Sequence, residues 1–462
     1  MERTFAQRMP SGFVLEIGML IGWSPAPPIA EVGERSLTVV NLPYGSSEIQ
    51  FSVSEERLLG ILKPRDVGGA KDAYSTVIEA LDNPVDGRGL SSAVKRGDTV
   101  VLVTDDYTRP TPSGQICKPI LDKLNSLGID DSHVTIVAAG GLHRPMTKDE
   151  LGEKFGEDLV NRVRIVSHDA WDDGELEYLG ETSRGTPVWV NKLVAKADLR
   201  MAVGMVTAHF LSGYASGPKT ILPGVSGYRT IFHNHGVIAA SLSARIGVTT
   251  GNPCWEDMVE TLRFLGPTLA VDVVLNVRNE LVAAFHGEPV SAQRAGLDLY
   301  HSIYAFHLKE KADIVIASSN PMYSYLDLCM KTIIHASMLV KDGGVRIVAS
   351  PCKEHLGPPF LEELYHRSLS GKWPTAEQYA EMMRLGIIKD IADATGILKF
   401  LQTNTSALTL VCEPSFDQDL TKMGFSHKSS IQEALDEATA RLGQESKVLV
   451  VPFGAVSHPI LK

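Results

Sequence analysis

The feature that most constrains the fold is a series of short apolar runs, rich in β-branched residues, that each end in polar residues. The three clearest runs are DTVVLVTDD at 98–106, HVTIVAA at 133–139 and LRMAVGM at 199–205. Such continuous runs are typical of strands buried on both faces of a parallel sheet. Helical patterns follow the first two, and the second helix should begin with a capping box of Thr147 and Glu150. This alternation of strand and helix predicts an α/β fold.

The length of the chain predicts two or three domains, and the apolar run DIVIA at 313–317 opens a second one. With 462 residues the chain is too long for a single core. We expect an N-terminal extension outside the fold at 1–36 and an N-terminal α/β domain at 37–300. A smaller C-terminal α/β domain should follow at 301–445, with a final strand and tail at 446–462. Both sheets should be mainly parallel, and the active site should lie in the cleft between the domains.

Composition and charge argue against several classes of function. The net charge is −11, whereas a nucleic-acid-binding protein usually carries a basic face. The five cysteines are scattered without a C-x-x-C pair, which indicates a reducing cytoplasm rather than a disulfide framework. No apolar run is long enough for a membrane span, and the run at 12–23 imitates a signal peptide but contains Glu16. We expect a cytoplasmic protein that binds neither nucleic acid nor membrane.

Polar residues follow the expected strands at the point where each strand ends. Asp106 and Arg109 follow the first run. His143 follows the second and His209 follows the third. In open α/β sheets ligands bind beyond the carboxyl ends of the strands, so these side chains should gather at one edge. An arginine fork suits a carboxylate, and two imidazoles can act as acid and base. The alternative for each residue alone is a surface ion pair or a structural histidine.

The segment GYASGPKTILPGVSGYRTIFHNHG at 213–236 combines small residues with one lysine and two histidines. Glycines allow the backbone to approach a ligand closely. Lys219 can form a covalent link to a cofactor, and the imidazoles of His233 and His235 can bind a metal. The alternative interpretation is a turn with a solvated lysine and two unrelated histidines. The segment is therefore a candidate cofactor site, and the rest of the chain must decide between the two interpretations.

Five segments of the chain resemble the LarA family, the nickel-pincer-nucleotide lactate racemases and their homologues. The segments are DDYTRPTP at 105–112, GLHRPMTKDE at 141–150, AHFLSGYASGPKTILPG at 208–224, HNH at 233–235 and the stretch at 320–331. The spacing of His209, Lys219 and His235 is that of the family. Together the segments span most of the chain from about residue 37 onward.

The resemblance implies a cofactor attached covalently to Lys219. This nickel-pincer nucleotide is a pyridinium-3-thioamide-5-thiocarboxylate mononucleotide that binds nickel. His235 would supply a protein ligand to the nickel, which suits the combination of soft sulfur and imidazole. Asp106, Ser216 and Gly217 would also bind the cofactor.

The resemblance also implies a reaction. His143 and His209 would act as the acid/base pair, while Arg109 and Lys331 would hold the substrate carboxylate. The implied enzyme is an isomerase, a racemase or epimerase of a 2-hydroxyacid, that works by reversible hydride transfer between C2 and the cofactor. The implied partners are the small-molecule 2-hydroxyacid and the proteins that make and deliver the cofactor.

Two residues on the substrate side depart from the family pattern. Lactate racemases carry a Tyr-Gln pair just before the lysine that matches Lys331, whereas this chain has Asp327 and Leu328. We therefore expect a 2-hydroxyacid that is lactate-like or larger, such as a sugar acid, rather than lactate itself. The family's next aromatic residue corresponds to Trp373 or Tyr379, and the sequence does not decide between them.

Two other functions fit the same residues. A divalent-metal hydrolase or lyase could use His233 and His235, although no suitably spaced acidic residue supplies a third ligand. A non-catalytic nucleotide- or metal-binding module would leave Lys219 without a covalent cofactor. The sequence predicts neither the oligomeric state nor a role for residues 1–36.

Overall fold

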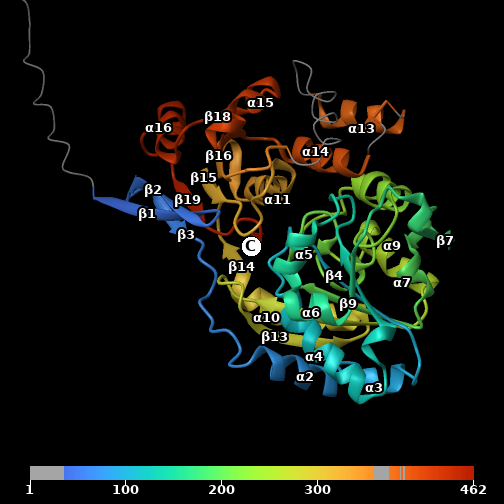
Figure 1. Ribbon diagram of the computed structural model, residues 1–462. Coiled ribbons are helices and arrows are strands. Elements are labelled where there is room, and N and C mark those ends of the chain that lie inside the picture. Colours follow the sequence, from blue (N-terminus) through green and yellow to red (C-terminus); the bar gives the residue numbers. More distant parts are fainter. Residues whose placement is uncertain (1–35, 357–373, 386, 389–390, 462) are drawn as a thin grey trace, which may run out of the picture.

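The computed structural model describes residues 36–356, 374–385, 387–388 and 391–461. These residues form two halves, each built on a six-stranded sheet (Figure 1). The strand pairs of both sheets are parallel except for one antiparallel pair at the edge of the first sheet. The prediction of an α/β protein with two mainly parallel sheets is thus confirmed.

The first sheet has the strand order β13–β12–β9–β4–β5–β6. Its strands are β4 (Val100–Asp105), β5 (Val134–Ala139), β6 (Arg164–Ser167), β9 (Leu199–Met205), β12 (Thr268–Leu275) and β13 (Leu281–Gly287). The helices of this half are α2 (Ala73–Asp82), α3 (Leu90–Ala93), α4 (Ser113–Ser126), α5 (Lys148–Phe155), α6 (Glu157–Arg162), α7 (Lys192–Lys196), α8 (Tyr228–Ile231), α9 (Pro253–Thr261) and α10 (Pro289–Tyr304). A hairpin of β7 (Leu176–Glu181) and β8 (Pro187–Asn191) and a short pair of β10 (Ala208–His209) and β11 (Gly213–Tyr214) complete it. The expected capping box of Thr147 and Glu150 is present at the start of α5.

Both faces of the first sheet are buried, as the continuous apolar runs predict. On one face Leu102 packs with Ile120 of α4. On the other face Val103 packs with Val190 of β8 and with Ile221. Burying one such side chain contributes about 1.5–3 kcal/mol to stability. The packing fixes the strands, so the loops at their carboxyl ends are held in defined positions.

The second sheet has the strand order β18–β17–β16–β15–β19–β3. Its strands are β3 (Leu58–Ile61), β15 (Ala312–Ser318), β16 (Val340–Ala349), β17 (Ala407–Val411), β18 (Ser426–His427) and β19 (Val448–Val451). The helices of this half are α11 (Leu326–Ser337), α13 (Ala376–Arg384), α14 (Ile391–Thr403), α15 (Asp417–Lys422) and α16 (Ile431–Leu442).

The first strands of the described chain belong to this second half. The hairpin of β1 (Leu37–Tyr44) and β2 (Ser47–Ser54) packs its apolar side chains on the face of the sheet that α16 covers. Strand β3 pairs with β19, which comes near the end of the chain (Figure 1). Residues 37–61 therefore lie on the second sheet and not in the N-terminal domain expected at 37–300, because β3 finds its partner near the end of the chain.

The contacts between the halves include one strand pair and one helix packing. Strand β14 (Ala305–Leu308) pairs in parallel with β20 (His458–Leu461) between the two sheets (Figure 1). Helix α14 of the second half packs on η4 (Phe232–Val237), a short π-helix of the first half. There the hydroxyl of Thr395 donates to the carbonyl of Gly236 at 3.1 Å, and Nζ of Lys399 donates to the carbonyl of Ser241 at 2.6 Å. Because η4 contains His235, this packing joins the second half to the candidate cofactor segment.

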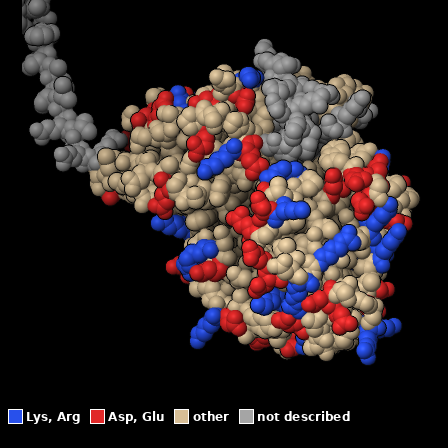
Figure 2. Space-filling model, in the orientation of Figure 1, with Lys and Arg blue, Asp and Glu red and all other residues tan. Residues whose placement is uncertain are grey.

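The described part of the chain contains no helix that is both long enough and apolar enough to cross a membrane. Figure 2 shows acidic and basic side chains interspersed over the face that it draws. Since the net charge is −11, the overall field does not attract an anion. An anionic ligand must therefore be held by basic residues at its own site.

Candidate active site

One cavity between the two halves collects the residues that the sequence singled out. Its volume is about 160 Å³, and both halves line it. The first half contributes Asp106, Arg109, His143, His209, Ser216, Lys219 and His235, and the second half contributes Asp327, Leu328, Lys331 and Gly396. Gly217 is buried beside Ser216 and is not part of the lining. Side chains far apart in the sequence thus meet at the carboxyl ends of the strands, in the cleft between the halves.

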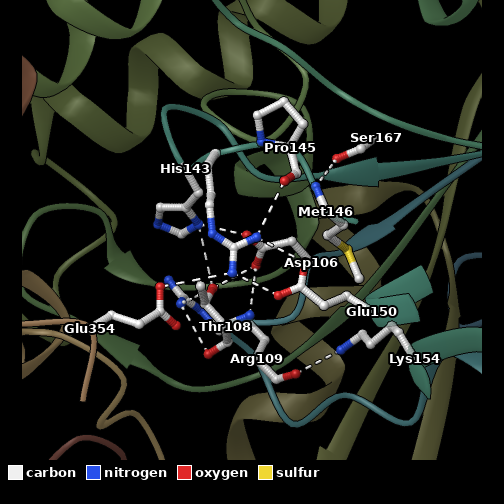
Figure 3. Close-up of polar contacts among 11 residues, drawn as sticks. Asp106, Thr108, Arg109, His143, Pro145, Met146, Glu150, Lys154, Ser167 and Glu354 are labelled. Atoms are coloured by element: carbon white, nitrogen blue, oxygen red, sulfur yellow. Dashed lines mark hydrogen bonds and ion pairs between the residues drawn. The ribbon is translucent and has the colours of Figure 1, made fainter. Parts of the chain in front are cut away.

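Asp106 and His143 form a hydrogen-bonded pair at the carboxyl ends of β4 and β5 (Figure 3). The Nδ1 atom of His143 lies 2.7 Å from Oδ2 of Asp106. The other carboxylate oxygen of Asp106 accepts from the hydroxyl of Thr108 at 2.5 Å. Burial disfavours the charged form of Asp106, but the interactions with His143 and Arg109 outweigh it and lower the pKa of this carboxyl below its usual value.

The ionised carboxylate of Asp106 only accepts hydrogen bonds, so it assigns the hydrogen of a neutral His143 ring to Nδ1. The Nε2 atom of His143 is then left with a lone pair, as a general base requires. The structure therefore places Asp106 as a partner of His143. A contact between Asp106 and a cofactor stays a prediction.

His209 has the opposite hydrogen-bond pattern. Its Nδ1 atom accepts from the backbone N–H groups of Leu211 and Ser212 at 3.3 and 3.4 Å. A neutral ring therefore carries its hydrogen on Nε2. Burial, followed by the charges of Lys219 and Lys331, lowers the pKa of His209 well below its usual value. His209 thus presents a hydrogen-bond donor, whereas His143 presents an acceptor.

Two cationic side chains line the cavity from opposite halves. The guanidinium of Arg109 donates to the hydroxyl of Thr108 at 2.8 Å, which holds it beside the pair of Asp106 and His143 (Figure 3). Nζ of Lys331 lies 3.9 Å from the sulfur of Met322, and within the described residues no carboxylate forms an ion pair with it. Burial and the neighbouring charge of Arg109 lower the pKa of Lys331 well below its usual value. An anion between the two residues would offset this repulsion.

The loop before Lys219 is held in a conformation that requires glycine. Ser216 and Gly217 both have positive φ angles, of 71° and 54°. A Cβ atom on Gly217 would lie 2.6 Å from the carbonyl oxygen of Pro289. The amide of Gln293 donates to the carbonyl of Ser216 at 3.0 Å. The loop thus approaches the cavity closely and fixes the position from which Lys219 extends.

Lys219 has a larger neutral fraction near neutral pH than an exposed lysine. Burial and the neighbouring charge of Arg109 lower its pKa from 10.5 to about 8. A substantial fraction of the amine is therefore neutral near pH 8, and a neutral amine is the form that attacks an electrophilic carbon. This property fits the expected covalent attachment of a cofactor.

His235 has one ring nitrogen without a partner. Its Nδ1 atom lies 2.9 Å from Oδ1 of Asn234, whereas its Nε2 atom is buried without a hydrogen-bond partner. An orphaned buried imidazole nitrogen at a cavity wall is what a metal ligand presents before the metal binds. The expected role of His235 therefore has a matching geometry.

Two other histidines lie outside the cavity. Nδ1 of His233 lies 2.8 Å from the hydroxyl of Thr186, and the ring does not line the cavity. Nε2 of His168 hydrogen-bonds to the carbonyl of Ser226 in the interior. Among the described residues, no group of three or more His, Cys, Asp or Glu side chains is arranged to hold a metal ion. The structure thus does not bring His233 and His235 together at one site.

The second half supplies the residues that depart from the family pattern. Asp327 lies in the first turn of α11, and Lys331 follows one turn later on the same face. Leu328 lines the cavity beside them. Tyr379 is fully buried in the core of the second half, and Trp373 lies outside the described residues. Asp327 and Leu328 therefore line the cavity at the positions where lactate racemases carry the Tyr-Gln pair.

Sequence reasoning gave no role to Asn234, Asp257 or Thr108, although all three hold side chains of the site. Asn234 lies inside the HNH segment, so its position was visible but its partner was not. Asp257 is buried in α9, and only the folding of the chain brings it into hydrogen-bond contact with Asn234. Thr108 lies in the loop after β4, where its hydroxyl joins Asp106 to Arg109. The sequence thus offered a signal for Asn234 and Thr108 through their neighbours, and none for Asp257.

Comparison with known proteins identifies the family. The sequence model of the lactate racemase N-terminal domain matches residues 44–247, and that of the lactate racemase C-terminal domain matches residues 308–457. The chain belongs to the lactate racemase (LarA) family. The lactate racemase of Lactiplantibacillus plantarum is 29% identical over 424 residues, which cover 90% of this chain and 99% of that protein. The lactate racemase of Thermoanaerobacterium thermosaccharolyticum is 29% identical over 423 residues, which cover 90% and 97%.

Solved structures agree with this assignment to the lactate racemase family. The lactate racemase apoprotein of Thermoanaerobacterium thermosaccharolyticum superposes with a TM-score of 0.81 at 28% identity, covering 92% of this chain and 100% of that one. A protein of Thermotoga maritima superposes with a TM-score of 0.66 at 16% identity, covering 84% and 98%. The second similarity shows the same fold only.

Proposed function

We propose that this protein is a racemase or epimerase that inverts C2 of a 2-hydroxyacid with the help of a nickel-pincer nucleotide attached to Lys219. The observation that carries the proposal is the single cavity that gathers Lys219, His235, His143 and His209 in a member of the lactate racemase family. The named lactate racemases are similar over nearly their whole length. Their activity on lactate is the starting point for this chain.

The residues of the cavity fit the cofactor. Lys219 offers a partly neutral amine for the covalent link, and the buried Nε2 of His235 offers a ligand for nickel. Ser216 and Gly217 would pass their backbone close to the nucleotide, since no side chain larger than hydrogen fits at Gly217. The chemistry that this group supplies when bound is the reversible acceptance of hydride from C2.

The two histidines handle the proton of the C2 hydroxyl. His143 takes the proton at Nε2, and the resulting positive charge is stabilised by the carboxylate of Asp106. His209 donates a hydrogen bond from Nε2 to the same oxygen. Attachment of the cofactor removes the charge of Lys219, and a substrate carboxylate offsets that of Lys331, so both changes raise the pKa of His209 from its lowered value.

Arg109 and Lys331 hold the substrate by its carboxylate. They line the same cavity from opposite halves, and an anion between them removes their mutual repulsion. Binding of the substrate carboxylate therefore stabilises the contact of the two halves at the cavity.

Asp327 points to a substrate other than lactate. Its carboxylate lines the cavity one helical turn before Lys331 and has no hydrogen-bond or ion-pair partner within the described residues. Burial raises the pKa of Asp327, so a second acidic group of a substrate is disfavoured beside it, whereas a hydroxyl group can donate a hydrogen bond to it. We therefore expect a monocarboxylic 2-hydroxyacid with further hydroxyl groups, such as a sugar acid.

The alternative of a divalent-metal hydrolase or lyase is not favoured. It needs His233 and His235 at one metal, whereas Nδ1 of His233 is hydrogen-bonded to Thr186 outside the cavity. A non-catalytic binding module would leave Lys219 unmodified, so the mass of the protein distinguishes this alternative from the racemase.

The deciding experiment is an intact mass and nickel analysis of protein produced together with the cofactor biosynthesis and delivery proteins. We expect a nickel-containing adduct that is absent from Lys219→Ala. A lactate racemase loaded in the same way is the positive control. Loaded protein should then interconvert the stereoisomers of 2-hydroxyacids in a chiral chromatography screen. An unmodified chain without nickel, next to a loaded control, would exclude this function.

A further inference from the structure

A buried chain of hydrogen bonds runs from Asp257 through Asn234 to His235. The amide nitrogen of Asn234 donates to Oδ2 of Asp257 at 2.7 Å and to the carbonyl of Cys254 at 3.0 Å. The amide oxygen of Asn234 lies 2.9 Å from Nδ1 of His235 and accepts the thiol of Cys254 at 3.3 Å. Asn234 and Asp257 are both completely buried, so water does not compete for these bonds.

The orientation of the Asn234 amide follows from its partners. A carboxylate and a backbone carbonyl are pure acceptors, so the group that faces Asp257 and Cys254 must be the NH₂ group. The opposite orientation would place an oxygen against two oxygens. The atom that faces His235 is therefore the carbonyl oxygen, which accepts and cannot donate.

The same reasoning continues to His235. Since its neighbour can only accept, Nδ1 of a neutral ring must carry the hydrogen. The lone pair then lies on Nε2, the buried atom that has no hydrogen-bond partner in the described structure. A metal binds to a ring nitrogen through this lone pair, and a partner on the other nitrogen is the usual way to select it.

Asp257 is itself fixed from two sides. Its Oδ1 atom accepts from the hydroxyl of Thr182 at 2.6 Å, and its Oδ2 atom accepts from the hydroxyl of Thr186 at 2.7 Å. These bonds tie α9 to the turn that connects β7 and β8. The carboxylate thus has a set position before any ligand enters the cavity.

We infer that Asn234 and Asp257 are positioning residues that fix the tautomer of His235 and present a bare Nε2 to the metal. The tautomer is a property of the protein alone, whereas the identity of the metal rests on the proposed function. Neither residue lines the cavity, so both act through His235.

The tautomer can be measured on the full-length protein without cofactor. Long-range ¹H–¹⁵N correlation spectra of ¹⁵N-histidine-labelled protein at pH 8 distinguish a ring nitrogen that carries hydrogen from one that does not, and His235→Gln assigns the signals. We expect the wild-type His235 to carry its hydrogen on Nδ1. In Asn234→Ala the signals should move towards a mixture of tautomers.

A matched control is Asn191→Ala. Asn191 is also a buried asparagine next to a buried histidine, since its amide lies 3.3 Å from Nδ1 of His168. The substitution therefore causes a similar loss of packing away from the cavity. We expect it to leave the tautomer of His235 unchanged, so a change that both variants share would indicate a general loss of structure.

Nickel retention gives a second measurement. After loading, Asn234→Ala and Asp257→Asn should hold nickel about 10–100-fold more weakly than wild type against a competing chelator, because partners of metal-binding histidines contribute this much to affinity. Asn191→Ala should match wild type.

The outcomes separate this inference from the proposed function. A wild-type His235 with its hydrogen on Nε2 would overturn the inference, even if the nickel adduct forms. The inference would also be overturned if Asn234→Ala kept the wild-type tautomer of His235 and if Asn234→Ala and Asp257→Asn both held nickel as tightly as wild type. An Nδ1 hydrogen that depends on Asn234, in a chain that never acquires nickel, would support the inference and reject the proposed function.

Discussion

Asp106 determines which ring nitrogen of His143 carries the hydrogen. The ionised carboxylate holds the hydrogen on Nδ1 and stabilises the ring once Nε2 takes a proton. Asp106→Asn keeps the shape but replaces one acceptor oxygen by a donor and removes the charge. We expect kcat to fall by about 10²–10⁴-fold, the usual contribution of general base catalysis. Steady-state kinetics on loaded protein measures it, and unchanged kcat with intact nickel content would contradict this role.

The pKa of Lys219 predicts how cofactor attachment depends on pH. The amine is neutral above its pKa, which burial and Arg109 lower to about 8. The fraction of reactive amine therefore rises as the pH increases from 7 to 9, whereas an exposed lysine would need a pH near 10.5. Labelling of Lys219 with a small acylating reagent, followed by mass spectrometry, should show a midpoint near pH 8. A midpoint above 10 would contradict the expected environment.

Asp327 predicts a preference among substrates. Hydrogen bonds to a charged acceptor contribute about 1.5–3 kcal/mol, or roughly 10–100-fold. Asp327→Ala should therefore lower kcat/KM for a polyhydroxylated 2-hydroxyacid by about this factor, with little change for lactate. The ratio of the two kcat/KM values is the measurement. Equal losses for both substrates would assign Asp327 a general role in the site instead.

The conformation of the loop before Lys219 depends on Gly217. A Cβ atom there would lie 2.6 Å from the carbonyl oxygen of Pro289, and φ is already positive. Gly217→Ala should destabilise the protein by about 2 kcal/mol or more and reduce the modification of Lys219. Gly97→Ala is a matched control, because Gly97 also has a positive φ but no atom within 4 Å of the added Cβ. Thermal unfolding and intact mass of both variants measure the difference.

Elements with a local signal could be predicted, and elements defined by distant partners could not. The buried strand β4 and the capping box of α5 follow from residues within one short window. The place of β3 beside β19 depends on residues at opposite ends of the chain, and the sequence of β3 does not indicate which strand it pairs with. The hydrogen bond between Nδ1 of His143 and Asp106 likewise joins residues that are distant in the sequence, so it could not be predicted.

The candidate site divides in the same way. The HNH segment and the Gly-Pro-Lys turn were visible in the sequence, because a motif keeps its spacing along the chain. The contact of Asn234 with Asp257 was not, since it joins two segments through the packing of α9. The sequence could thus predict which residues form the site. The hydrogen-bond partners that set the tautomer of each histidine are defined only by the three-dimensional structure.

At the scale of the whole molecule, α14 connects the second half to the π-helix that carries His235. Lys399→Met removes the buried bond from its ammonium to the carbonyl of Ser241. A bond to a charged group contributes about 1.5–3 kcal/mol, so amide hydrogen exchange in residues 232–241 should become roughly 10–100-fold faster. Lys428→Met, which removes an ion pair with Glu437 on the surface of the second half, should leave these amides unchanged. Mass-spectrometric exchange would measure both.

The position of β3 has a consequence for how the protein is made. Its partner β19 begins about 390 residues later in the chain. At the usual pace of translation β3 therefore waits roughly 20–80 s on the ribosome before its neighbour is synthesised. During that time one of its edges offers free backbone groups to other nascent chains. We conclude that the second sheet is completed only once β19 has been synthesised, and that β3 is exposed to wrong pairing until then.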